Sequence, residues 1–154
     1  MNPRASREAM TEGTTSWGCK RLQMEEDGIT VKNWYLDGLG LVDLPDELFD
    51  VPISGHLSLD NNEIRSLPAA VGRLKVGGDL YLSCNRLTTL PSEMAQMEVG
   101  GNLWLSCNEI ATLPSEMAQM EVGGELYLNG NPDLDEDAAR ALLRDAPFRV
   151  VYPW

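Results

Sequence analysis

The feature that most constrains this chain is a repeat of 23 residues. Apolar residues recur at that spacing, at Ile53, Val76, Val99 and Val122. The segments 76–98 and 99–121 are identical at 18 of 23 positions. Because periods of about 20 to 50 residues are typical of stacked repeats, we predict an array in which each unit contacts mainly its neighbours.

Each repeat contains an alternating Leu-x-Leu segment, which predicts a short strand with two side chains pointing inward. The inward columns are Trp34, Leu57, Leu80, Leu103, Leu126 and Leu36, Leu59, Leu82, Leu105, Leu128. Three residues later, where the chain must turn, stand Asn62, Asn85, Asn108 and Asn131. A buried amide there can satisfy neighbouring backbone groups, so we expect an asparagine ladder in which the last residue, Asn131, matters less. The first repeat has Leu39 instead, which suggests an end unit.

These residues resemble the leucine-rich-repeat family, whose pattern L-x-L-x-x-N-x-L is matched by LSLDNNEI, LYLSCNRL and LWLSCNEI. The recurring Leu-Pro pair, followed by an apolar residue three positions later, resembles the 23-residue subclass of Ras-suppressor-type and bacterial repeat proteins. The resemblance covers roughly residues 30–131. It implies an α/β solenoid, a horseshoe segment with five parallel strands, an N-terminal β-hairpin cap and a C-terminal helical cap.

The length of 154 residues fits one domain, which we place at residues 17–154. Its expected parts are a hairpin strand at 17–29, repeats at 30–52, 53–75, 76–98 and 99–121, a partial repeat at 122–131 and a C-terminal cap at 132–154. Residues 1–16 are polar, and we expect a disordered tail there.

Local signals predict how each end is closed. Asp27 and Gly28 form a good pair for a two-residue hairpin turn between two alternating runs. At the other end, Asp133 followed by Glu136 resembles a capping box. The helix that begins there would turn an apolar face, which includes Leu134, Ala138, Leu142 and Leu143, onto the last repeat. The final segment FRVVYPW should add a short apolar strand.

The charge balance limits the classes of partner. The chain carries 24 acidic and 12 basic residues, a net charge of −12, which opposes binding to nucleic acids and anionic membranes. No segment has the apolar run of a secretory signal or of a membrane span. Three cysteines, an odd number, argue against a disulfide framework and agree with a reducing compartment. We therefore expect a cytoplasmic protein, with secretion without a cleaved signal peptide as the alternative.

The sequence offers no catalytic or metal-binding constellation. His56 is the only histidine, and we interpret it as a solvated surface residue. The glycine pairs at 77–78, 100–101 and 123–124 are interpreted as compact backbone corners because no phosphate-loop pattern accompanies them. Cys84 and Cys107 share a column of small residues, where we favour two free thiols over a redox or metal pair. We expect no enzyme activity, no cofactor and no metal.

The outward positions of the strands would form a continuous concave surface with an aromatic run at Tyr81, Trp104 and Tyr127, bordered by carboxylates. The candidate partner-binding residues are Tyr35, His56, Asp60, Asp79, Tyr81, Asn102, Trp104, Glu125 and Tyr127. An aromatic patch with an acidic rim suits an Arg- or Lys-bearing segment. The alternative is structural, since neighbouring aromatic residues also stabilise a sheet.

The function that we predict is a monomeric protein-interaction module that binds a basic or amphipathic protein on its concave surface. Two alternatives remain open. One is an exported bacterial effector that mimics leucine-rich-repeat proteins of a host. The other is an inhibitor of a basic enzyme.

Overall fold

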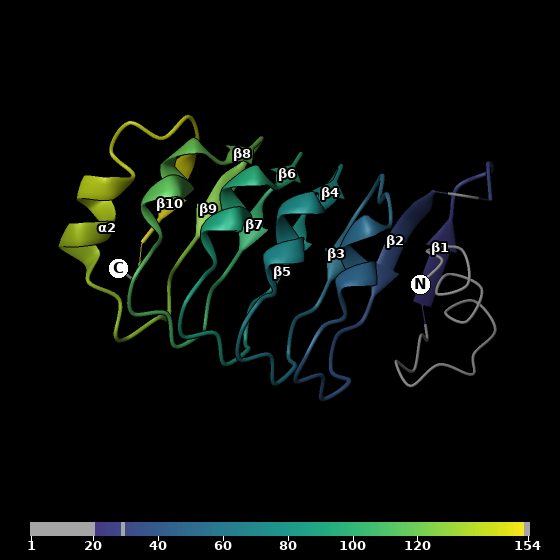
Figure 1. Ribbon diagram of the computed structural model, residues 1–154, viewed down its shortest axis with the longest axis horizontal. Helices are drawn as coiled ribbons and strands as arrows, with labels where there is room; N and C mark the ends of the chain where they lie inside the picture. Colours follow the sequence, from purple (N-terminus) through teal and green to yellow (C-terminus); the bar gives the residue numbers. More distant parts are fainter. Residues whose placement is uncertain (1–20, 29, 153–154) are drawn as a thin grey trace.

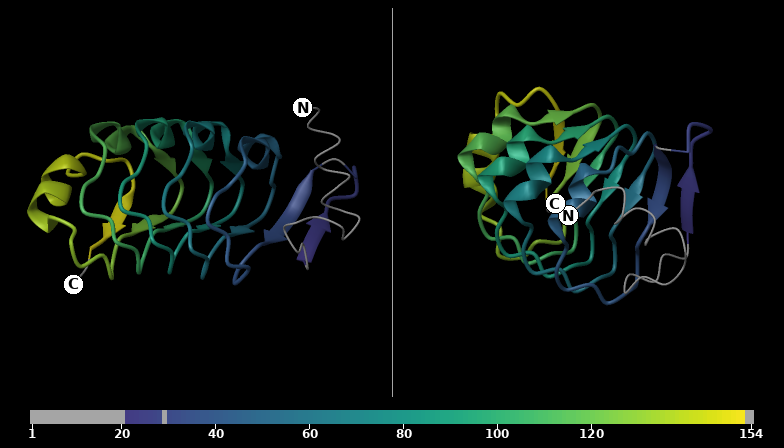
Figure 2. Two further views of the ribbon diagram at one scale, coloured as in Figure 1. Left: turned by 60° about the horizontal axis from the view of Figure 1, so that its bottom comes forward. Right: turned by 45° about the vertical axis from the view of Figure 1, so that its right-hand side comes forward.

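The computed structural model describes residues 21–28 and 30–152, so the expected disordered tail, the start of the hairpin strand and Trp154 lie outside the described residues. Successive coils of the chain lie side by side along the long axis (Figure 1). In each coil a short strand lies on one side and a 3-10 helix on the opposite side (Figure 2). The chain therefore returns to the same side of the molecule once per repeat.

Within the described residues, the strand side is a seven-stranded sheet in the order β1-β2-β3-β5-β7-β9-β10. These strands are β1 (Arg21–Met24), β2 (Val31–Tyr35), β3 (Leu57–Ser58), β5 (Leu80–Tyr81), β7 (Leu103–Trp104), β9 (Glu125–Tyr127) and β10 (Arg149–Val151). Their pairs are parallel except β1 with β2, which is antiparallel. The repeats predicted five strands, and the larger number arises because β1 and β10 add to the two edges of the sheet.

The register of this sheet follows the 23-residue spacing. Leu57 is paired with Leu80, Leu80 with Leu103, and Leu103 with Leu126. A one-residue slip would turn every leucine of a strand toward solvent, so burial of one face fixes this register. The outward residues are consequently aligned in columns as well.

A second, three-stranded sheet lies at the entrance of each coil within the part of the chain that the structure describes, and the sequence analysis did not predict it. Its strands are β4 (Lys75–Val76), β6 (Glu98–Val99) and β8 (Glu121–Val122). The opposite side carries the 3-10 helices η1 (Asp46–Asp50), η2 (Ala69–Arg73), η3 (Ser92–Gln96) and η4 (Ser115–Gln119). Each of these helices follows the proline of a Leu-Pro pair, whose φ lies between −66° and −74°. Proline suits a helix start because its φ is fixed and it has no N–H to satisfy.

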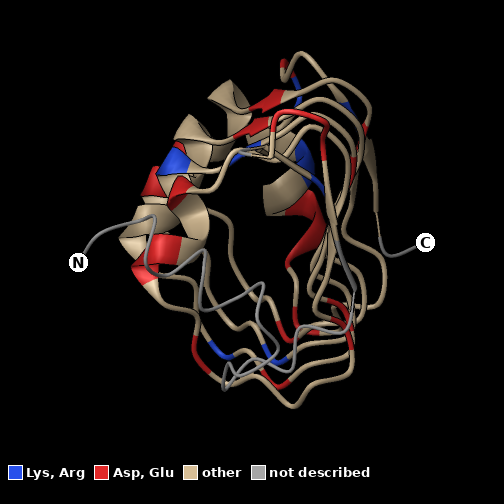
Figure 3. Ribbon diagram, turned by 90° about the vertical axis from the view of Figure 1, so that its right-hand side faces the viewer, with Lys and Arg blue, Asp and Glu red and all other residues tan. Residues whose placement is uncertain are grey.

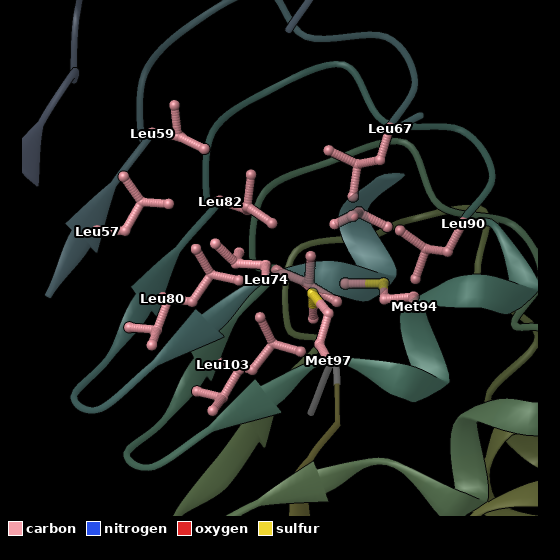
Figure 4. Close-up of a cluster of buried hydrophobic side chains, with 14 of the residues drawn as sticks. Leu57, Leu59, Leu67, Leu74, Leu80, Leu82, Leu90, Met94, Met97 and Leu103 are labelled. Carbon is pink, nitrogen blue, oxygen red and sulfur yellow. The ribbon is translucent and has the colours of Figure 1, made fainter. Parts of the chain in front are cut away.

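The core fills the space between the strands and the 3-10 helices (Figure 4). Leu80, Leu103, Met94 and Met97 are completely buried, so these two methionines belong to the core. Each buried side chain of this size contributes about 1.5–3 kcal/mol. Because neighbouring coils share these contacts, a single repeat would lose much of that stabilisation.

The asparagine ladder is confirmed. The Nδ2 atom of Asn85 donates to the carbonyl oxygens of Leu59 at 3.0 Å and Leu82 at 3.1 Å, and its Oδ1 accepts the Ile64 N–H at 3.2 Å. The same type of bonding is made by Asn62, Asn108 and Asn131. Asn131 keeps three such bonds and is 1% exposed. The expectation that it matters less is therefore not supported by its contacts.

The connection between β1 and β2 is longer than the predicted two-residue turn. The ladder ends at the pair Met24 and Val31, and the Glu25 N–H donates to the Thr30 carbonyl across the loop at 2.9 Å. The Asp27 carboxylate accepts both the backbone N–H and the hydroxyl of Thr30, which stabilises this wider loop. These two bonds of Asp27 thus favour a longer loop than the two-residue turn that was predicted from Asp27 and Gly28.

The C-terminal helix α2 (Glu136–Leu142) starts later than predicted. Its N-cap is Asp135, whose Oδ1 accepts the Ala138 N–H at 3.0 Å, so the prediction of Asp133 is wrong. The cause is a preceding turn, in which the Leu134 N–H donates to the Asn131 carbonyl. Among the described residues, no helix is long and apolar enough to cross a membrane.

The buried face of α2 also differs from the prediction. Leu134 is buried as expected, but Ala138 is exposed and Leu142 is half-buried. The buried residue of α2 is Ala139, and the C-cap residue one turn later, Leu143, is buried as expected. The later helix start rotates the apolar stripe by one residue relative to the predicted one.

Candidate functional site

The outward side chains of β2, β3, β5, β7 and β9, with the residues that flank them, form three columns that we call the strand surface. The entry column is Asn33, His56, Asp79, Asn102 and Glu125. The central column is Tyr35, Ser58, Tyr81, Trp104 and Tyr127. The exit column is Asp37, Asp60, Ser83, Ser106 and Asn129. All nine residues that the sequence analysis selected lie in these columns.

The entry column is a chain of hydrogen bonds from one coil to the next. Asn33 Oδ1 accepts the His56 N–H at 2.8 Å, and His56 Nδ1 accepts the Asp79 N–H at 2.9 Å. Asp79 Oδ1 then accepts the Asn102 N–H at 2.7 Å, and Asn102 Oδ1 accepts the Glu125 N–H at 2.8 Å. Three of the accepting residues, His56, Asp79 and Asn102, were expected from the sequence to bind a partner, but these acceptor atoms already serve the fold. The signal that could have revealed this is a short side chain with an acceptor atom at every 23rd position.

His56 is not the solvated residue that the sequence predicted. It is half-buried, and its ring lies edge-on to that of Tyr81, with 6.2 Å between the ring centroids. Because Nδ1 accepts the Asp79 N–H, that nitrogen carries no proton and the neutral ring must be protonated at Nε2. His56 therefore joins two coils and stands against the central column.

The central column contains a continuous aromatic stack. The Tyr81 and Trp104 centroids are 5.9 Å apart with an interplanar angle of 13°, and those of Trp104 and Tyr127 are 3.8 Å apart at 2°. In-register pairing of β5, β7 and β9 brings the rings together. Each such pair contributes about 0.5–1.5 kcal/mol. The stack holds the Trp104 ring in a fixed orientation.

The tyrosine hydroxyls of the stack are anchored by carboxylates. Tyr81 donates to Asp79 Oδ2 at 2.9 Å, and Tyr127 donates to Glu125 Oε2 at 2.6 Å. Burial, followed by the bond to Asp79, raises the pKa of Tyr81 to about 12. The bond to Glu125 is the main cause of a raised pKa of Tyr127. Both hydroxyls thus remain protonated donors at neutral pH.

Two side-chain polar atoms of the strand surface are fully buried and lack a partner among the described residues. The indole Nε1 of Trp104 and the hydroxyl of Ser83 are buried and make no hydrogen bond within the described part of the chain. A buried polar group without a partner costs about 1–3 kcal/mol. The position of Trp104 is therefore not optimised for the stability of the fold alone.

The expected acidic rim is only partly available to a partner. Asp79 accepts two hydrogen bonds, and Glu125 accepts the Tyr127 hydroxyl and forms an ion pair with Arg149 at 3.4 Å. The Oδ1 atom of Asp60 accepts the Ser83 N–H at 2.6 Å, and burial raises the pKa of Asp60. Acidic segments also occur at several other positions around the coils (Figure 3). The negative charge is consequently not confined to the strand surface.

Cys84 and Cys107 follow the exit column in a row with an unusual backbone. Their φ is 55°, Asn61 has 56°, and the glycines at 38 and 130 have 68° and 76°. This left-handed conformation explains the glycines and the asparagine of the row, which adopt it most readily, but not the two cysteines. Both cysteines are free and exposed, and desolvation, with Cys107 as a further cause, raises the pKa of Cys84. Within the described residues no cluster of three or more metal-binding side chains occurs.

The glycine pairs lie at backbone bends, in agreement with the predicted corners, and the close approach of successive coils explains why these positions are glycine. A Cβ atom at Gly100 would collide with the carbonyl oxygen of Gly77, and one at Gly123 would collide with that of Gly100. Successive coils therefore approach too closely at this position for any side chain. The pairs follow the three-stranded sheet and allow its strands to lie side by side.

No family model matches the sequence, and no curated protein matches it. Among solved structures, the chain is similar to the leucine-rich-repeat protein LIC12759 of Leptospira interrogans, with 29% sequence identity and a TM-score of 0.56. The match covers 70% of this chain and 28% of the other, so this chain spans less than a third of that protein's length. The chain therefore has a leucine-rich-repeat-like fold.

Proposed function

We propose that the chain is a protein-interaction module built as a leucine-rich-repeat solenoid of the 23-residue subclass. In this proposal the β1–β2 hairpin closes one end and α2 closes the other. The in-register rows of leucines and the asparagine ladder support the proposal, as does the similarity to a leucine-rich-repeat protein. Stacked repeats need covered ends because an exposed terminal repeat would leave its apolar face in water.

The partner that we propose is a basic or amphipathic protein segment that lies across the strand surface. The observation that carries this proposal is the stack centred on Trp104, which holds a large side chain outside the leucine core with its N–H unsatisfied. Central aromatic side chains contribute most of the energy in protein interfaces. The net charge of −12 favours the encounter with a basic partner.

The proposal also covers what the module does not do. We propose a monomer that works without cofactor or metal, binds neither nucleic acid nor membrane, and catalyses no reaction. The acidic excess supports the exclusion of polyanionic partners. Turnover of a substrate by the isolated chain would contradict this part of the proposal.

The test compares Trp104→Ala with a matched control, Val42→Ala, in binding to a partner isolated by affinity capture. Val42 is an exposed apolar residue, 41% accessible, outside the three columns of the strand surface. We expect Trp104→Ala to weaken binding by about 2 kcal/mol, roughly thirtyfold, and Val42→Ala to leave it unchanged. Calorimetry would measure both affinities. An unchanged affinity of Trp104→Ala would move the binding site away from the strand surface.

A further inference from the structure

We propose that the strand surface contains a pocket for an arginine side chain of the partner, at the gap that Ser58 leaves in the central column. This inference rests on the proposed function, since it specifies which side chain of the partner is bound. Four coils place Tyr or Trp in the central column, whereas β3 places a serine there. The sequence analysis did not select Ser58 or Asp37 as site residues.

The gap is an open pocket with a volume of about 320 Å³. It is lined by Tyr35, Ser58 and Tyr81 of the central column, by Asp37, Asp60 and Asn61, and by His56, whose ring lies edge-on to that of Tyr81. None of the described residues that line it is Lys or Arg. This volume is at the lower end of the range for small-molecule sites, which begins at about 300 Å³. The pocket is therefore large enough for one long side chain.

The spacing of the walls suits a flat cation. Neighbouring strands lie about 4.8 Å apart, so Tyr35 on β2 and Tyr81 on β5, two strands away, are about 10 Å apart. A group midway between these two strands would lie about 5 Å from each strand, a separation compatible with the ~6 Å reach of a cation–π interaction. With an aromatic ring at position 58 this space would be filled, as it is between Tyr81 and Tyr127.

Two polar groups at the gap, the Ser58 hydroxyl and one carboxylate oxygen of Asp60, can accept a hydrogen bond but receive none from the residues that the structure describes. Ser58, which lines the pocket, is 8% exposed, and its hydroxyl makes no hydrogen bond among the described residues. Asp60 uses Oδ1 for the Ser83 N–H, which leaves Oδ2 without a donor in the described part of the chain. Burial and the negative charge of Asp37 both raise the pKa of Asp60. A cation bound beside these carboxylates would remove that penalty.

Arginine satisfies these features better than lysine. Its planar guanidinium stacks on aromatic faces and presents five N–H donors in a fixed arrangement, so one group can reach a carboxylate and a hydroxyl together. The lysine ammonium is a compact charge that is more strongly hydrated and has no flat face to place between two rings. The arrangement of rings and acceptors therefore selects a guanidinium.

The test is an NMR titration of the full chain with N-acetyl-arginine amide, with the neutral isostere N-acetyl-citrulline amide and N-acetyl-lysine amide as comparisons. We expect the arginine probe to shift the amide signals of Ser58, Asp60 and Tyr81 with a roughly millimolar Kd. The citrulline probe should bind at least tenfold more weakly, and the lysine probe more weakly than arginine. Equal binding of citrulline, equal binding of lysine, or no shifts at the pocket would overturn the proposal.

Two variants locate the binding. Ser58→Tyr should fill the pocket and weaken arginine binding at least tenfold, while it keeps the fold because neighbouring coils carry tyrosine in this column. Asp60→Asn should also weaken it, and Val42→Ala should not change it. Unchanged binding by a folded Ser58→Tyr variant would contradict the pocket. If arginine fails to bind but Trp104→Ala still weakens the protein partner, the pocket is rejected and the proposed function stands. If arginine binds but Trp104→Ala leaves the affinity of the protein partner unchanged, the pocket remains as an arginine site and the proposed Trp104-centred partner site is rejected.

Discussion

The inner asparagine ladder and the entry column of the strand surface both join one coil to the next, but they use different chemistry. Each ladder asparagine donates and accepts, as Asn85 does with the Leu59 and Leu82 carbonyls and the Ile64 N–H. Asparagine is the side chain of this size that can donate and accept hydrogen bonds while buried without a charge. The ladder accordingly has asparagine in all four coils that it spans.

The entry column places a weaker demand on its residues. The bond to the next coil needs only an acceptor: Asn33, His56, Asp79 and Asn102 each accept one backbone N–H there, at a half-buried position. Three residue types meet that demand because each offers an acceptor atom at a short distance from the backbone. The difference teaches that uniform and varied polar columns can have the same structural role. Variation on an outward face is therefore not by itself a sign of a binding site.

Exchanging asparagine and aspartate between the two columns should show the largest difference between them. Asn85→Asp removes the donor and places a carboxylate against the Leu59 and Leu82 carbonyl oxygens, so we expect a loss of about 3 kcal/mol or more. Asp79→Asn keeps the acceptor, as Asn102 shows, and should change stability by less than about 0.5 kcal/mol. Urea denaturation would measure both free energies of unfolding. Equal losses would show that the two columns have the same chemical demand.

The last position of the ladder tests whether its members are equivalent. Asn131→Ala and Asn85→Ala should each cost about 1–3 kcal/mol, because both residues are buried and bond to the preceding coil in the same way. The measurement is urea denaturation of the two variants under one set of conditions. A clearly smaller loss at Asn131 would restore the expectation from the sequence that the last turn matters less.

At Cys84, backbone conformation rather than hydrogen bonding limits the residue type. Its φ of 55° is unfavourable for a side chain with a Cβ, so Cys84→Gly should stabilise the fold by up to about 1 kcal/mol. Cys84→Ala keeps the Cβ and serves as the control. Thermal unfolding would compare them, and a Cys84→Ala variant as stable as Cys84→Gly would rule out backbone strain as the cause.

Asp60 should give the smallest effect, and its sign depends on pH. Burial raises its pKa above 3.8, so the folded state favours the protonated carboxyl and stability from this group is lost as pH rises through the folded-state pKa. Asp60→Asn keeps an acceptor for the Ser83 N–H without the charge. We expect a higher Tm than wild type at pH 7 and no difference at pH 3. A gain of equal size at both pH values would exclude the charge as its origin.

Much of the fold could be predicted because burial dictates it. The spacing of the leucines determines the register, and the turn after each strand requires the buried amides of Asn62 to Asn131. The use of the outward residues could not be predicted, since alternation shows which face Asp79 occupies but not that its oxygens already accept two hydrogen bonds. The helix start at Asp135 was also missed, because Asp133 has the same capping chemistry and only the turn at Leu134 distinguishes them.

The two residues of β7 differ in how much they contribute to folding, and their free energies of unfolding test this difference directly. Leu103 is fully buried in the core, and Leu103→Ala should cost about 2–5 kcal/mol. Trp104→Ala loses two ring contacts but removes an unsatisfied buried N–H, so its net cost should be about 1 kcal/mol or less. Urea denaturation of the two variants gives both values. A loss for Trp104→Ala as large as that for Leu103→Ala would show that the aromatic stack is part of the folding core.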